Sequence, residues 1–167
     1  MDLRAVRTLQ MSFLAFAIML SMVSSLFVPA ANAADGTVYV SAIDGDDAND
    51  GGSVNTPLKT IEKAIQMVGS TGTVVLLSDF TFTQTLPISA GGKTVTIRSE
   101  EGSKFSIIRG NGFINGHLIQ ISGGNITLQN LIIDGNNVKT NAGIFGVYVT
   151  GGAGIFENVM IHNHNVQ

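Results

Sequence analysis

The chain has 167 residues, a net charge of −3 at pH 7, 13% charged residues and no cysteine. Without cysteine it forms no disulfide framework and cannot be a lipoprotein attached through an N-terminal cysteine. Its weak, dispersed acidic charge lacks the basic surface that nucleic acids and anionic membranes require, so we expect no nucleic-acid partner. The length fits one domain.

The first 33 residues have the three parts of a secretory signal. Arg4 and Arg7 make a basic start, residues 11–28 form an apolar middle, and a small-x-small cleavage pattern ends at Ala33. The alternative is a transmembrane anchor, but the apolar run is short for a span of about 20 residues and no basic cluster follows it. We therefore predict cleavage after Ala33, a secreted or cell-surface protein, and no membrane association after cleavage.

Residues 34–70 are predicted to form an N-terminal cap. Residues 37–42 have the pattern of a strand, residues 44–55 of a polar loop, and residues 57–68 of a short helix. The helix has one apolar face, made of Leu58, Ile61, Ala64, Ile65 and Val68. A stack of parallel strands begins with an open apolar end, and we expect this helix to cover it.

Residues 71–167 are predicted to form the coils of a solenoid, because they contain an internal repeat. Residues 118–137 align without a gap on residues 146–165, at a shift of 28, and residues 88–102 give a looser third copy. Each unit has short alternating segments separated by one or two residues, which is too short for an ordinary parallel crossover. Successive coils would then pair in parallel, with Asn130 stacked on Asn158 at a bend where asparagine accepts unusual backbone angles.

Three segments carry a resemblance to a known family. They are Tyr-Val-Ser at 39–41, Gly-Asp-Asp-Ala-Asn-Asp-Gly-Gly at 45–52 and Thr-Pro-Leu-Lys-Thr-Ile-Glu-Lys-Ala-Ile at 56–65. This opening resembles that of secreted proteins of the pectate-lyase-like superfamily. The resemblance implies an all-β fold, a right-handed parallel β-helix with a short N-terminal capping helix. It does not select an activity, because members include polysaccharide lyases, glycoside hydrolases, epimerases and non-catalytic surface proteins.

The polar loop offers hard oxygen ligands of the kind that calcium takes. The candidate ligands are Asp44, Asp46, Asp47 and Asp50, with Asn49 between them. Their spacing does not match the Asp-x-Asp-x-Asn-Gly calcium loop, because Ala48 stands where a third ligand is expected. A solvated cap loop is the favoured interpretation, and calcium is the candidate cofactor.

Asp134, His162 and His164 are the candidate catalytic residues. The 28-residue shift places Asp134 beside His162 on adjacent coils, about 4.8 Å apart along the stack. A carboxylate next to an imidazole can serve acid/base chemistry or hold a sugar hydroxyl. The competing interpretation is a polar pair at a turn that faces water.

The resemblance also implies what a lyase would need, namely calcium-binding acidic residues and an Arg or Lys that removes a proton. No catalytic motif of this kind is carried over onto the chain. The cations available in the repeats are Lys93, Arg98, Lys104, Arg109 and Lys139. Tyr148 and Phe156 are expected to pack in the interior or at turns, not to form a sugar-stacking platform.

Two function classes follow from these observations. The favoured one is a secreted or cell-surface β-helix protein that interacts with extracellular polysaccharide or cell-wall glycan without a catalytic site in this segment. The alternative is a lyase or glycoside hydrolase whose catalytic residues lie mostly beyond residue 167. We expect the coils to be truncated at the C-terminus, because the last repeat strand is followed by no covering segment.

Overall fold

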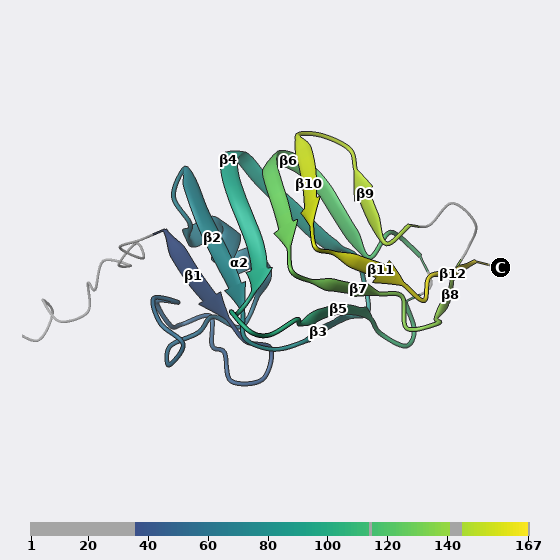
Figure 1. Ribbon diagram of the computed structural model, residues 1–167, viewed down its shortest axis with the longest axis horizontal. Coiled ribbons are helices and arrows are strands. Elements are labelled where there is room, and N and C mark those ends of the chain that lie inside the picture. The colour runs from purple at the N-terminus through teal and green to yellow at the C-terminus, as the bar shows by residue number, and fades with distance from the viewer. Residues whose placement is uncertain (1–35, 114, 141–144, 167) are drawn as a thin grey trace, which may run out of the picture. The chain divides into compact units, whose positions relative to one another are not determined.

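The computed structural model describes residues 36–113, 115–140 and 145–166 (Figure 1). The predicted signal, residues 1–33, lies outside the described residues, and the boundary between cap and coils remains a prediction. Within the described part of the chain, no helix is long and apolar enough to cross a membrane.

The described chain is mostly β, with parallel strands in three sheets and one short helix. This confirms an all-β class and is compatible with the expected β-helix. The largest sheet contains β1 (Thr37–Val40), β2 (Thr71–Leu76), β4 (Leu86–Ser99), β6 (Ile119–Gln129), β10 (Ala153–Glu157) and β9 (Val147–Val149), which pairs with β6. The second sheet contains β3 (Phe80–Phe82), β5 (Ser106–Arg109), β7 (Ile132–Asp134) and β11 (Met160–His162). The third pairs β8 (Lys139–Thr140) with β12 (Asn165–Val166).

The strand register follows the predicted repeat. Ile119 pairs with Val147 in the first part of the largest sheet, and Ile133 pairs with Ile161 in the second sheet. Both pairs are 28 residues apart, as the gapless alignment predicts. The looser third copy is also explained, because the register of β4 against β6 shifts between Ile88 and Thr94.

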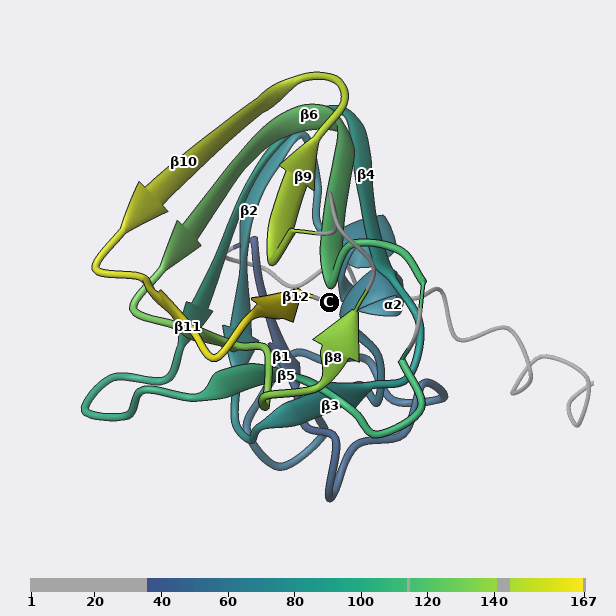
Figure 2. The same cartoon turned by 90° about the vertical axis from the view of Figure 1, so that its right-hand side faces the viewer.

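The long strands β4 and β6 bend at glycines, which divides the largest sheet into two walls. Gly91 and Gly124 have φ values of 59° and 83° inside these strands, and Gly152 has 76° between β9 and β10. A Cβ atom on Gly124 would come within 2.8 Å of the Ala90 side chain. Only glycine tolerates this backbone conformation and approach without strain. In the end view the two walls and the second sheet enclose the core on three sides (Figure 2).

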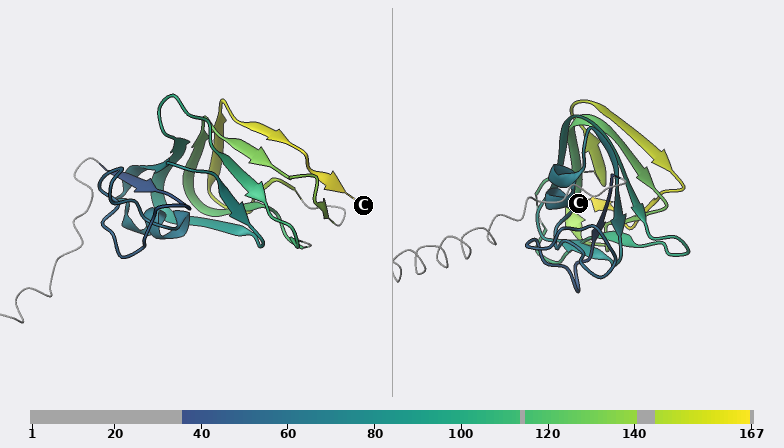
Figure 3. Two further views of the ribbon diagram at one scale, coloured as in Figure 1. Left: turned by 90° about the horizontal axis from the view of Figure 1, so that it is seen from below. Right: turned by 90° about the vertical axis from the view of Figure 1, so that its left-hand side faces the viewer.

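The core consists of side chains that alternate inward and stack between coils. Val74, Ile97 and Leu128 occupy equivalent positions of β2, β4 and β6, and all three are fully buried. At the N-terminal end of this stack (Figure 3), α2 (Ile61–Met67) packs against β1, β2 and β4. All five residues of the predicted apolar helix face are buried there.

The helix starts later than the predicted 57–68. Thr60 is its N-cap, with the side chain accepting a hydrogen bond from the Lys63 N–H, while Leu58 forms a parallel bridge with Val40. Because Leu58 pairs with Val40, its backbone is extended, and the helix begins only after Thr60. At the other end, the Lys93 ammonium donates to the carbonyls of Ile65, Gln66 and Val68, the orphan acceptors of the last turn.

Candidate functional site

The second wall of the largest sheet consists of β1, β2, β10 and the parts of β4 and β6 that follow the glycine bends. Its outer surface carries rows of polar side chains. Its central row is Thr37, Thr73, Thr96 and Thr127, paired in unbroken parallel register through β1, β2, β4 and β6. All four are partly exposed, because the strand alternation that turns their neighbours into the core turns them outward. A second row, Thr71, Thr94 and Asn125, runs beside it and is exposed.

Sequence reasoning missed these rows, although a signal was present. Thr-x-Thr or Asn-x-Thr occurs at 71–73, 94–96 and 125–127. The spacings are 23 and 31 residues, so a search for a constant 28-residue period does not align them. Loops of unequal length absorb the difference, and only the strand pairing brings the three segments into register.

A charged third row borders the threonines. Arg98, Gln129 and Glu157 are equivalent positions of β4, β6 and β10. The Gln129 side-chain amide donates to the Glu157 carboxylate at 2.8 Å, and Nη1 of Arg98 donates to the Ser99 carbonyl at 2.9 Å. This row places a cation, an amide and an anion at successive coils, about 4.8 Å apart.

A cleft of about 330 Å³ lies where this row meets the corner of the coil. It is lined by Arg98, Ser99, Glu101, Gly102, Gln129 and Asn130. The lining offers guanidinium and amide donors together with carboxylate and carbonyl acceptors. Such mixed donors and acceptors can bind the hydroxyl groups of a sugar.

The asparagines at this corner form the predicted stack. Asn130 and Asn158 have φ values of 53° and 52°, and the side-chain amide of Asn158 donates to the Asn130 side-chain oxygen at 2.9 Å. The Asn130 amide in turn donates to the Ser103 carbonyl at 2.7 Å. These contacts confirm the bend and the stacking, and they hold one edge of the cleft in place.

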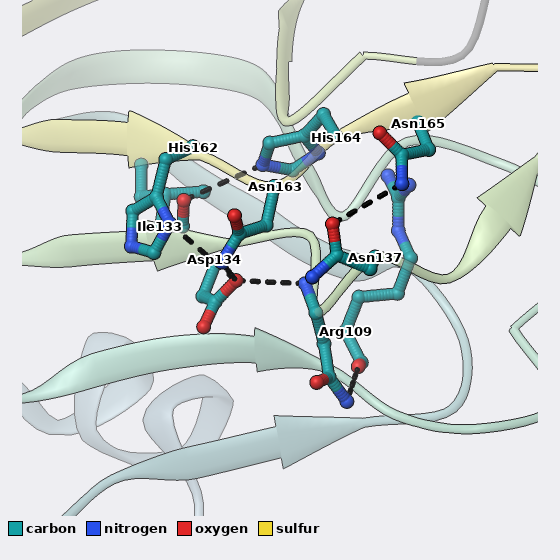
Figure 4. A network of polar contacts seen from close by, with 9 residues as sticks. Arg109, Ile133, Asp134, Asn137, His162, Asn163, His164 and Asn165 are labelled. Atoms are coloured by element: carbon teal, nitrogen blue, oxygen red, sulfur yellow. Dashed lines mark hydrogen bonds and ion pairs between the residues drawn. The ribbon is translucent and has the colours of Figure 1, made fainter.

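Asp134 and His162 are neighbours, as the repeat predicts. They pair between β7 and β11, with Nδ1 of His162 3.9 Å from Oδ1 of Asp134 (Figure 4). The same Oδ1 accepts hydrogen bonds from the Asn136 N–H at 2.7 Å and from the Asn163 amide at 2.9 Å. The carboxylate therefore holds a turn, and its catalytic role remains a prediction.

The environment of Asp134 lowers its pKa overall. Partial burial acts to raise the pKa, but the hydrogen bonds from Asn136 and Asn163 and the neighbouring imidazoles of His162 and His164 outweigh it. The carboxylate is therefore ionised at neutral pH, which suits a hydrogen-bond acceptor at a turn better than a proton donor.

His164 does not share this surface with His162. Its ring is partly buried, with Nε2 3.4 Å from the Ile133 carbonyl and the Nδ1 atom buried. Burial lowers the pKa of His164, and the charge of Arg109 lowers it further, against smaller opposing effects from Ile133 and Asp134. Asn163, with a φ of 58°, bends the chain between the two histidines, and the catalytic role of His164 remains a prediction.

The acidic loop uses its carboxylates as turn acceptors. Asp47 accepts from the N–H groups of Lys59 and Thr60 and from the Thr60 hydroxyl. Asp46 accepts from the Ala48 N–H, and Asp50 from the Gly52 N–H and the Thr56 hydroxyl. Among the described residues no group of three or more His, Asp or Glu side chains could hold a metal ion, and calcium binding in this loop remains a prediction.

Two of the cations named from the sequence are not available on the surface. Lys93 caps α2, and Arg109 is fully buried. Tyr148 and Phe156 are 40% and 44% exposed; Tyr148 faces outward beside Gln120, whereas Phe156 is at the position equivalent to the buried Leu128. The Tyr148 ring contacts that of His117 in a tilted arrangement, with 4.2 Å between ring centroids.

Comparison of the chain with protein-family models, with characterised proteins and with solved structures gave no significant match. The functional conclusion therefore depends on the geometry of the described residues.

Proposed function

We propose that this chain is a secreted or cell-surface protein that binds an extended polysaccharide along the outer surface of β2, β4 and β6. The observation that carries the proposal is the four-threonine row beside the cleft. The row and the cleft together form a hydroxyl-bearing surface that ends in a concave site with charged and amide groups. Binding, without catalysis in this segment, is the function that this surface suits.

Geometry supports an extended polymer as the ligand. Each coil advances the surface by about 4.8 Å, close to the length of one sugar residue in an extended chain. Equivalent side chains of neighbouring coils would contact successive sugars. A compact ligand would bind in the cleft alone and would make no contact with the rows of threonines.

We also propose the finer description of the fold, a right-handed parallel β-helix of the pectate-lyase-like type. Support comes from the parallel register between successive coils and from the strong preference of parallel crossovers for the right hand. The proposed secretion is supported by the composition of residues 1–33, and N-terminal sequencing of the exported protein tests it. A start at Ala34 is expected, and a start at Met1 would contradict cleavage.

Affinity electrophoresis of the exported protein against neutral and uronate polysaccharides tests the binding proposal. We expect retardation by at least one polymer, and a loss of about tenfold in affinity when Thr96→Val and Arg98→Gln are combined. Thr81→Val is the matched control, because Thr81 is an exposed threonine on β3, outside the proposed surface. Binding to no polymer, or equal losses in the control, would reject the proposal.

The same incubations separate binding from catalysis. The chain length of each polymer is measured before and after contact with the protein. An unchanged length is expected, whereas shortening would support the enzyme alternative and direct attention to Asp134 and His162.

A further inference from the structure

Arg109 is a charged side chain in the interior of the stack. On β5 the side chains of Ile107 and Arg109 alternate inward, and Arg109 has no exposed surface. Its register partner on β3 is Phe82, an apolar side chain that packs against the core. A guanidinium stays protonated at every pH at which the protein is folded, so the charge is buried with it.

The described residues satisfy only part of this group. Nη2 donates to the Phe145 carbonyl at 3.3 Å, and the guanidinium carbon lies 5.0 Å from the centroid of the Phe113 ring. The nitrogens Nε and Nη1 are buried and have no hydrogen-bond partner. Within the described part of the chain, no carboxylate lies within 4.0 Å of the Arg109 guanidinium. The ion pair that is present joins His162 and Asp134.

A second unpartnered atom lies at the same place. The Arg109 guanidinium donates to the Phe145 carbonyl, and the His164 ring packs against Gly146, the next residue. A Cβ atom on Gly146 would come 2.9 Å from Cε1 and Nε2 of His164, so glycine is required for the ring to enter. Since Nε2 faces the Ile133 carbonyl and donates to it, the buried Nδ1 of a neutral ring is a bare lone pair. The hydrogen-bond donors without a partner beside Phe145-Gly146 therefore belong to Arg109. The His164 ring packs beside them and offers no donor.

We propose that Arg109 binds a small inorganic anion of the size of chloride inside the stack, beside the turn at Phe145-Gly146. Buried charges in proteins are paired, and a cation–π contact with one carbonyl does not replace an anion. The ligand is small because the guanidinium has no exposed surface through which the carboxylate of a polymer could reach it. The site is independent of the polysaccharide surface, which lies on the outside of another wall.

Thermal unfolding of the full chain in sodium chloride and in sodium gluconate at equal ionic strength tests this proposal. Gluconate is too large for the site, so only chloride should add binding energy to the folded state. At about one hundred times the dissociation constant, chloride should raise the Tm by roughly 10 °C relative to gluconate. Equal Tm values in the two salts would overturn the proposal.

The Arg109→Met variant removes the donors while keeping an apolar side chain of similar length. We expect it to fold, because replacing a buried charge with a hydrophobic residue is often neutral or stabilising, and we expect its Tm to be the same in both salts. Arg98→Met is the control and should retain the full chloride effect. A chloride effect that persists in Arg109→Met would contradict the assignment of the site.

Chloride-35 NMR of the unsubstituted chain keeps the test decisive if Arg109→Met does not fold. Exchange with a protein-bound site should broaden the chloride line, and added bromide should compete and narrow it again. A line as narrow as that of buffer alone would overturn the proposal.

Discussion

The two copies of the 28-residue repeat differ in burial although they share one sequence pattern. Ile121, Leu128 and Ile133 in the earlier copy are fully buried. Their register partners in the later copy, Val149, Phe156 and Ile161, are 41%, 44% and 51% exposed. The pattern therefore directs a side chain inward, but a neighbouring coil on each side is needed to bury it.

At the N-terminal end of the stack, burial likewise depends on a covering layer. There α2 and the residues before it cover the interior row that begins with Val38, which is fully buried. Stability in such an architecture is the sum of interfaces between layers, so equivalent substitutions should differ in cost between covered and uncovered layers.

The largest effect is expected for core truncation in the covered copy. Leu128→Ala should lower the free energy of unfolding by about 2–5 kcal/mol, because it leaves a cavity between two coils. Phe156→Ala at the equivalent position should cost less than about 1.5 kcal/mol despite removing more atoms, since its ring already contacts water. Urea denaturation measures both. Equal losses would show that the later copy is covered in solution.

The asparagine stack should give a smaller difference. Asn130→Gly should cost about 1–1.5 kcal/mol, because it removes the donor to Ser103 and the acceptor of Asn158. Asn158→Gly, which loses only exposed contacts, should cost about 0.5 kcal/mol. Replacing either residue with alanine should add about 1 kcal/mol for the positive φ. Alanine and glycine variants of equal stability would contradict the strain argument.

Acid should weaken the interior next to Arg109. Burial lowers the pKa of His117 and of His164, and the Arg109 charge adds to the effect at both residues. In the folded state both residues bind a proton less readily than in the unfolded chain. The neutral histidines therefore make their full contribution to the free energy of unfolding above the unfolded pKa of about 6.5. This contribution is lost as the pH falls below that value.

The free energy of unfolding should therefore fall between pH 7 and pH 5, which urea denaturation at several pH values measures. His164→Leu should flatten the profile. A steeper profile in His164→Leu would contradict the sign of this argument.

The smallest effect concerns Asp134. Its lowered pKa means that it stabilises the fold above the unfolded pKa of about 3.9 and that this contribution disappears as the pH falls through the lower folded value. Asp134→Asn should cost less than about 1 kcal/mol at pH 7, since the turn amides retain an oxygen acceptor. A loss at pH 7 as large as that of Leu128→Ala would mean that the turn is part of the core.

Much of the architecture could be predicted from the sequence. The two-residue alternation and the 28-residue shift identified the inward positions of two coils, and the Asn130 and Asn158 bend followed from them. The position of the helix was predicted to within a few residues, because its apolar face has a 3.6-residue period. Its start was missed because Leu58 satisfies a strand pairing that local propensity does not contain.

The polar surface and the interior charge lay beyond such reasoning. Thr73, Thr96 and Thr127 come together only after loops of unequal length have been absorbed, and hydrogen-bonding register between distant segments decides their alignment. The inward orientation of Arg109 follows the alternation of β5, but only the closed stack shows that its donors lack partners.

By itself, then, the sequence determined the periods, the bend at the two asparagines, and which side of each strand faces the core, because these depend on contacts a few residues apart. The tertiary structure alone decided which coils are covered, which threonines form one surface and where a buried cation is left unpaired. The physical reason is that burial and pairing belong to two segments at once, and neither segment specifies its partner alone.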